Sequence, residues 1–260
     1  MGVFDGVKAS LTGTKAYRTH LAANKLMDEE KPDEARKKFA QALALYEEAE
    51  RLGAQDYNVL RGYAVLLLRE GEFERARDLM LKISRRKGLS EEEWFSLRVQ
   101  FSLYQWKTGQ LDKAIETIGR AAAHKVNGMI YSTLGMYLVD KARQTGDFAE
   151  ALAYNEKALE YDDEDGSVLD NMGQLYESMA GAAQGDEAAE YLAKAKSWFE
   201  KAHEVKPRQI TTLYYLARLY HREGDDARAR KLLAGRDKLY ISALCPVNRQ
   251  MLDALAGEIG

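Results

Sequence analysis

The chain has 260 residues, of which 46% are apolar and 30% are charged, and its formal net charge is −3. This balance is typical of a soluble folded protein and excludes a disordered chain, while the slightly negative charge excludes a global basic field that would hold nucleic acid. The longest apolar run, "YAVLLL" at 63–68, is too short to span a bilayer. We therefore expect partners that are neither nucleic acids nor membranes.

The cysteine content and the first residues both indicate a reducing compartment. Cys245 is the single cysteine, so no disulfide can form within the chain. The first 20 residues show no basic stretch followed by an apolar core, which a secretory signal would need. We expect a cytoplasmic protein.

Helix breakers are rare along the chain. It has three prolines (Pro32, Pro207 and Pro246), which lie far apart, whereas Ala, Leu, Glu, Lys and Arg are abundant. These residues favour helices, so the sequence predicts helix nearly throughout and no strand.

One short pattern around a glycine recurs along the chain, first as "REGEFERAR" at 69–77 and last as "REGDDARAR" at 222–230. A glycine ends a helix well because it adopts the left-handed conformation without a Cβ penalty, and a following acidic or polar residue favours a new helix. The pattern predicts a turn between two helices at a nearly constant period, which indicates a solenoid. Its glycines, at spacings of 38, 37, 39 and 39, are Gly71, Gly109, Gly146, Gly185 and Gly224.

Small and aromatic residues stand at fixed offsets from these turns. The most complete example, at 171–207, supplies Met172, Gly173, Tyr176, Ala195, Phe199, Ala202 and Pro207. The chain thereby resembles the tetratricopeptide repeat family, whose unit is a helix–turn–helix with small and aromatic residues at these offsets. The resemblance implies an all-α fold, a right-handed α-solenoid of six repeats.

The repeats divide nearly the whole chain into similar units. We expect them at 16–53, 54–90, 91–127, 128–165, 166–209 and 210–243. The fifth unit is longer by 10 residues between Tyr176 and Ala195, 19 residues where 9 are typical, so its helices and loop are extended.

Both ends of the chain have apolar residues at helical spacing. In segment 1–15, Phe4, Val7 and Leu11 share one helix face and are interpreted as a cap, with docking of a membrane or a partner as the alternative. Segment 244–260 is predicted to be a capping helix, because Asn248 suits an N-cap. Its apolar face consists of Leu252, Leu255 and Ile259.

No catalytic, metal or cofactor site is predicted. The four histidines lie in different repeats without metal-motif spacing, and we interpret His20 as a surface residue. Cys245 has no nearby histidine to activate it. The stretch "YDDEDGSVLDNM" is similar to a calcium loop, but Tyr161 and Met172 replace its first and last carboxylates. We expect a protein that is not an enzyme.

The resemblance implies that the first helix of each repeat lines an inner groove. Asn and Gln side chains there can bond a peptide backbone, cations can hold carboxylates, and aromatic rings can anchor apolar side chains. Carried over by register, the candidate binding residues are Asn24, Asn58, Arg61, Arg69, Trp106, Lys107, Gln174, Tyr214 and Arg218.

The chaperone-binding subset of the family holds a carboxylate with a Lys/Asn/Asn/Lys/Arg clamp. The corresponding positions hold His20, Asn24, Gly62, Ser96 and Gln100, of which Asn24 alone matches. The sequence does not predict membership of that subset.

The leading hypothesis is an adaptor or scaffold that binds an unidentified protein or peptide, with acidic character. We expect it to dock across the second and third repeats on Arg61, Arg69 and Lys107, with Trp106 packing on an apolar side chain. The first alternative is a structural protein acting through homo-oligomerisation. The second is a regulatory peptide receptor, for which the 15 residues before the first repeat are too few to hold a DNA-binding module.

Overall fold

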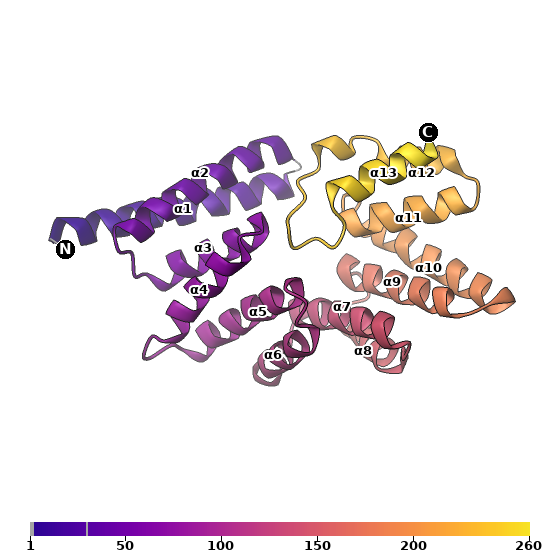
Figure 1. Cartoon of the computed structure of the whole chain (residues 1–260), viewed down its shortest axis with the longest axis horizontal. Helices are drawn as coiled ribbons and strands as arrows, with labels where there is room; N and C mark the ends of the chain where they lie inside the picture. Colours follow the sequence, from indigo (N-terminus) through magenta and orange to yellow (C-terminus); the bar gives the residue numbers. More distant parts are fainter. Residues whose placement is uncertain (1–2, 30) are drawn as a thin grey trace. The chain divides into compact units, whose positions relative to one another are not determined.

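The computed structural model describes residues 3–29 and 31–260, which form two compact units (Figure 1). Unit 1 comprises residues 1–110 and 242–244, and unit 2 comprises 111–241 and 245–260. The described residues contain helices and no strand, so the predicted all-α solenoid of helical repeats is confirmed.

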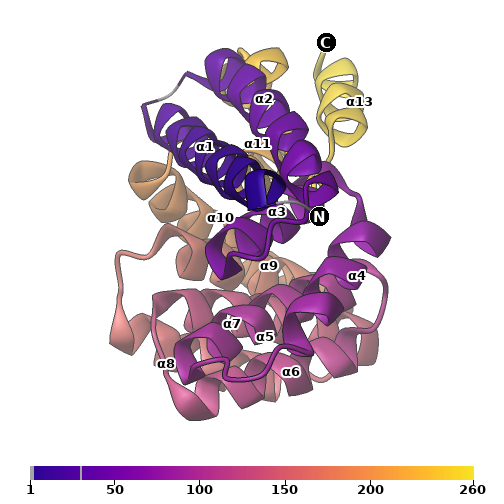
Figure 2. The same cartoon turned by 90° about the vertical axis from the view of Figure 1, so that its left-hand side faces the viewer.

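Unit 1 contains two antiparallel helical hairpins followed by one further helix. The α1 and α2 helices lie side by side along their lengths in Figures 1 and 2, and α3 packs on both neighbouring first helices, α1 and α5. Its helices are α1 (Val3–Asp28), α2 (Pro32–Arg51), α3 (Tyr57–Glu70), α4 (Phe73–Ser84) and α5 (Glu91–Lys107).

Unit 2 repeats the same arrangement, with α9 packed on both α7 and α11. The elements of unit 2 are α6 (Leu111–His124), α7 (Gly128–Thr145), α8 (Ala149–Tyr161), α9 (Gly166–Ala182), α10 (Gly185–Val205), α11 (Ile210–Arg222), α12 (Asp226–Leu233), the short 3-10 helix η1 (Arg236–Lys238) and α13 (Arg249–Ile259).

Four of the five recurring glycines follow the end of a first helix as predicted, whereas Gly185 is the first residue of α10, and α9 ends before it at Ala182. Gly71 ends α3 with φ of 85°, and Gly146 ends α7 with φ of 76°, conformations that a side chain would strain. These turns reverse the chain so that consecutive helices pack antiparallel.

Close approach within a hairpin depends on small residues. A Cβ added to Gly173 on α9 would lie 2.6 Å from the Phe199 ring of α10, which is fully buried. Phe199 in turn stacks on Tyr215 of α11, with ring centroids 5.5 Å apart. One glycine therefore lets an aromatic ring join two successive hairpins.

The two ends of the chain differ in burial. Asn248 accepts a hydrogen bond from the Met251 N–H at 2.9 Å at the start of α13, which buries Leu252, Leu255 and Ile259 in unit 2. On α1, Val7 is 56% and Leu11 67% exposed, so neither is buried as a packed cap would be, and the Phe4 side chain lies outside the described residues.

Substitution of Gly173 tests the close approach. Gly173→Ala should lower the free energy of unfolding by about 1–3 kcal/mol, because the methyl group displaces the Phe199 ring. Gly181→Ala on the same helix is the matched control, since nothing lies within 4 Å of its added Cβ. The control should be neutral or stabilising by up to about 1 kcal/mol in urea unfolding monitored by circular dichroism. Equal effects of the two substitutions would contradict this packing argument.

Candidate binding site

The first helices of unit 1 bring together two predicted binding residues from different repeats. The Arg69 Nη1 on α3 donates a hydrogen bond to the Asn24 Oδ1 on α1 at 2.7 Å. The Arg69 guanidinium also lies over the Phe39 ring of α2, 5.4 Å from its centroid. Asn24 and Phe39 thus hold Arg69 in one orientation, while its positive charge forms no ion pair with any described residue.

Arg61 precedes Arg69 by eight residues on α3, about 12 Å along the helix. It is half-buried, and within the described part of the chain it makes no hydrogen bond or ion pair. A partly buried guanidinium loses some of its hydrogen bonds to water. An anionic group of a ligand would supply hydrogen-bond acceptors in their place. Arg61 is therefore the cation of this face best placed to receive an acidic group.

His20 packs against the Phe39 and Tyr46 rings of α2 and is buried, with 4% of its surface exposed, which corrects its interpretation as a surface residue. Its Nδ1 lies 3.3 Å from the Tyr46 hydroxyl, and its Nε2 has no hydrogen-bond partner. Burial, followed by the positive charges of Arg69 and Arg61, lowers the pKa of His20 to about 4. The ring is neutral at neutral pH.

The burial of His20 follows from a stripe that the sequence already contains. The buried residues of α1 recur at intervals of four and three, which places them on one side of the helix. They are Ala9, Gly13, Ala16, His20 and Ala23. Reading this spacing would have placed His20 against α2 rather than in solvent.

The low pKa of His20 makes the stability of the chain depend on pH. The pKa is about 4 in the folded chain against an ordinary value of 6.5, so the unfolded chain binds more protons between these pH values. Stability should therefore be unaffected by His20 above pH 6.5 and should fall by about 3 kcal/mol as the pH drops to 4. The free energy of unfolding measured in urea between pH 6.5 and 4 checks this expectation.

His20→Gln should remove the contribution of His20 to the pH dependence of stability. The free energy of unfolding of this variant should therefore fall less steeply between pH 6.5 and 4 than that of the wild type. The exposed His124 gives the matched control, His124→Gln, which should keep the wild-type slope. A wild-type slope in His20→Gln would show that other groups cause the acid sensitivity.

The remaining predicted residues of unit 1 lie on α3 and α5. Asn58 is exposed in the first turn of α3, next to Tyr57, whose hydroxyl donates to the Glu93 carbonyl at 2.8 Å. Trp106 and Lys107 are half-buried at the end of α5, where the Lys107 Nζ lies 4.9 Å from the Trp106 ring centroid. The contacts that hold Arg69 thus come from the first repeat, α1 and α2, rather than from the third.

In unit 2, Gln174 lies inside the core instead of on a binding surface. It is 6% exposed, and its amide donates to the Asp170 carboxylate at 2.7 Å. Thr212 and Thr211 of α11 donate to the same carboxylate at 2.6 and 2.9 Å. Burial raises the pKa of Asp170, and these donors act in the opposite direction. Gln174 is therefore removed from the candidate set, because its amide helps to join α9 to α11.

Asp170→Ala should lower the free energy of unfolding by about 2–4 kcal/mol, because it leaves three buried donors without an acceptor. The exposed Asp163 on the preceding turn provides the control, and Asp163→Ala should change stability by less than about 0.5 kcal/mol. Thermal or urea unfolding of both variants makes the comparison. A stability loss no larger than that of the control would mean that water satisfies these donors.

Tyr214 and Arg218 of unit 2 lie together, and the positive charge of Arg218 is neutralised by a neighbouring acidic side chain. Arg218 makes an ion pair with Glu177, and its guanidinium lies 5.5 Å from the Tyr214 centroid and 5.0 Å from that of Tyr215. An incoming anion would have to compete with Glu177. This arrangement differs from Arg61, which has no such acid among the described residues.

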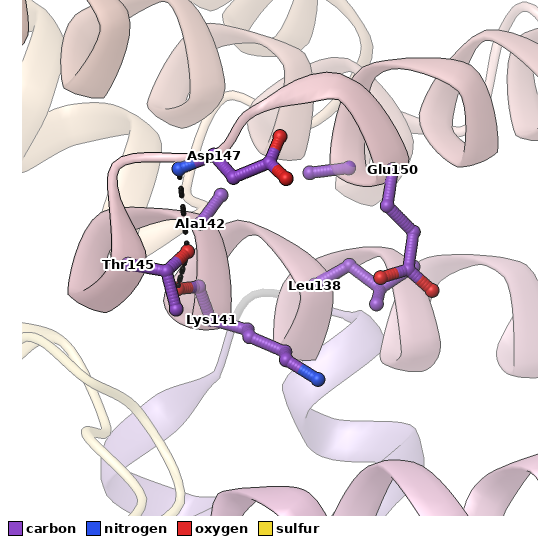
Figure 3. Close-up of a pocket in the computed structure, with 7 residues that line it drawn as sticks. Leu138, Lys141, Ala142, Thr145, Asp147 and Glu150 are labelled. Carbon is purple, nitrogen blue, oxygen red and sulfur yellow. Dashed lines mark hydrogen bonds between the residues drawn. The ribbon is translucent and has the colours of Figure 1, made fainter.

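A shallow pocket of about 150 Å³ lies between α7 and α8 in unit 2 (Figure 3). Asp147 and Glu150 point carboxylates along its rim, and Lys141 makes an ion pair with Asp112 at 3.5 Å. The Thr145 hydroxyl accepts a hydrogen bond from the Asp147 N–H at 3.3 Å and donates to the Lys141 carbonyl at 3.1 Å.

The described residues offer neither a metal cluster nor a membrane span. They contain no group of three or more His, Cys, Asp or Glu placed to hold a metal ion. None of their helices combines the length and apolar character needed to cross a bilayer.

Comparison with known proteins agrees with the helix-pair architecture. Residues 26–100 match the family model described as tetratricopeptide repeat. No curated protein matches the chain with significance. The fold and its first-helix surface define a protein built of helical repeats. The match to the family model covers 75 of the 260 residues and, together with the helical-repeat fold, supports the resemblance of the chain to tetratricopeptide repeat proteins.

Three solved structures illustrate the likeness in fold. TTC0263, a thermophilic tetratricopeptide-repeat protein of Thermus thermophilus, aligns with TM-score 0.51 and 16% identity over 65% of this chain and 81% of that one. PilF of Pseudomonas aeruginosa aligns with TM-score 0.54 and 15% identity over 96% of this chain and 99% of that one. PilW, a type IV pilus biogenesis factor, aligns with TM-score 0.56 and 14% identity over 92% of this chain and 98% of that one. At these identities the likeness concerns the fold alone.

Proposed function

We propose that the chain is a non-enzymatic adaptor. It binds an acidic segment of a protein partner on the face formed by the first helices of unit 1, α1, α3 and α5. The tetratricopeptide repeat fold is in general a scaffold for protein–protein interaction. The observation that carries the finer proposal is Arg61, a half-buried guanidinium without an acidic partner among the described residues. A carboxylate can accept two parallel hydrogen bonds from such a group.

The neighbouring residues have separate roles in this proposal. Arg69 adds a second positive charge that Asn24 and Phe39 hold in place. The exposed Asn58 amide is free to bond a peptide backbone, and Trp106 offers an aromatic surface at the end of α5. A segment that carries an acidic residue and an apolar one would match these chemical groups.

The compartment proposed for this adaptor is the cytoplasm. Cys245 is the single cysteine of the chain, and binding through charged and amide groups requires no disulfide. Localisation of a tagged full-length chain in cells checks this proposal directly.

Removing both arginines tests the binding face. Arg61→Ala with Arg69→Ala should weaken binding of a fluorescein-labelled peptide of alternating Glu and Leu by about 1–3 kcal/mol in fluorescence anisotropy. The salt dependence of binding should also decrease, because fewer charges contribute. Circular dichroism should show wild-type helicity in this variant.

A double variant that removes the same charge elsewhere in unit 1 serves as the control. Lys82→Ala with Arg85→Ala alters two cations at the end of α4 and should retain wild-type affinity. Equal weakening in the two double variants would indicate a response to net charge alone. Unchanged affinity in the arginine variant would move the peptide site elsewhere.

Self-association is the second candidate function. Val7 and Leu11 lie one turn apart on α1 and are 56% and 67% exposed, an unusual placement for two apolar residues on one helix face. Val7→Ser with Leu11→Ser should lower the mass measured by light scattering at high concentration if this face joins two copies. A monomeric wild-type chain at every concentration would remove this candidate.

A further inference from the structure

The His20 ring is enclosed by groups from three helices of unit 1. Tyr46 faces its Nδ1 from α2, and the Phe39 ring lies edge-on with centroids 5.7 Å apart. Arg69 and Arg61 of α3 lower the pKa of the ring, whereas the Gly62 backbone beside it acts in the opposite direction. The charged side chains that influence the ring most strongly are thus both cationic.

This environment leaves one ring nitrogen with unused bonding capacity. Because Nδ1 is directed to the Tyr46 hydroxyl, Nε2 is the atom without a partner, although the residue is only 4% exposed. Buried polar atoms are nearly always bonded, so an atom without a protein partner calls for an explanation, and a polar group from a ligand nearby is one. The two guanidinium groups oppose a positive charge on the ring for as long as no anion offsets them.

We propose that Arg61, Arg69 and His20 form one oxyanion-binding subsite, in which binding of the partner's anionic group is linked to uptake of a proton by His20. The proposal rests on the proposed function, because the anion belongs to the acidic partner. The ligand group is a carboxylate, or a phosphate or sulfate with the same oxyanion chemistry.

The proposed roles follow from the contacts. Arg61 binds the anion with its planar fork, and Arg69 contributes charge from an orientation fixed by the Asn24 amide at 2.7 Å. The proton comes from solvent and adds to Nε2, giving an imidazolium, while no covalent bond of the ligand changes. His20 acts through the field of the site and is a positioning residue.

The size of the coupling is limited by burial. Burial is the largest cause of the lowered pKa of His20, followed by Arg69 and Arg61, and a bound anion offsets only the effect of the arginines. An opposite charge at close range raises such a pKa by about one unit or more. We therefore expect the pKa to rise from about 4 by about one unit when the subsite is filled.

The experiment is an NMR titration of the histidine rings in the full chain, in sodium sulfate and in sodium chloride of equal ionic strength. Sulfate is the probe because it stays ionised throughout the range, and His20→Gln identifies the signal. The pKa of His20 should be higher in sulfate for the wild type and for Lys82→Ala, and equal in the two salts for Arg61→Ala. Equal values in the wild type, or an undiminished rise in Arg61→Ala, would overturn the proposal.

A second measurement applies if the chain unfolds in acid before His20 titrates. The pH midpoint of unfolding, followed by circular dichroism, should be lower in sulfate than in chloride for the wild type and Lys82→Ala. Arg61→Ala should lose this difference between the salts. The same shift in all three chains would reflect general salting-out by sulfate and would contradict the subsite.

Competition at pH 7 separates the anion sources and the two proposals. Displacement of the labelled acidic peptide by glutarate assigns the subsite to carboxylates, displacement by inorganic phosphate assigns it to phosphate groups, and displacement by neither contradicts it. If the arginine double variant loses the peptide but sulfate leaves His20 unchanged, the proton linkage fails and the adaptor function stands. If sulfate raises the pKa of His20 but no acidic peptide binds, the subsite stands and the adaptor function fails.

Discussion

The close approach of the two helices in each hairpin is the constraint on which the rest of the structure depends. Within a hairpin, there is no room for a Cβ at Gly173 beside the Phe199 ring; between successive hairpins, a Cβ added to Gly62 on α3 would lie 2.5 Å from the Tyr46 hydroxyl on α2. Small residues at these points let large rings fill the space between helices. A hairpin packed this way still has one apolar face uncovered, so it needs the next hairpin, and within each unit the first helices of successive hairpins come to lie side by side.

That adjacency explains why charged residues far apart in the sequence share an environment in unit 1. Arg69 meets Asn24 across 45 residues because α1 and α3 are neighbouring first helices. The same packing buries His20 near these arginines, where desolvation and positive charge act in the same direction on its pKa. The influence of these two cationic side chains on a buried base is therefore a product of the repeat geometry rather than of any local motif.

The two units handle polar groups on their first helices differently. In unit 2 the Asp170 carboxylate accepts from Thr211, Thr212 and Gln174, and Arg218 pairs with Glu177, so the polar groups satisfy one another. In unit 1 Arg61 and the Nε2 of His20 have no such partners among the described residues. Satisfied networks stabilise a fold, whereas unsatisfied groups near a surface are available to a ligand.

The sequence by itself determined the helical class, the repeat period and the turns, because these depend on local preferences: a glycine such as Gly71 ends a helix in whatever array it stands. It also indicated that Asn24, Arg61 and Arg69 are on first helices. Only the tertiary structure decided which of those side chains are available. Gln174 was expected on a surface and lies buried on Asp170, His20 lies under α2 and α3, and Arg218 has an acidic partner while Arg61 has none within the described ranges. The physical reason is that burial and pairing depend on side chains from two or three helices at once, and register along one helix does not contain that information.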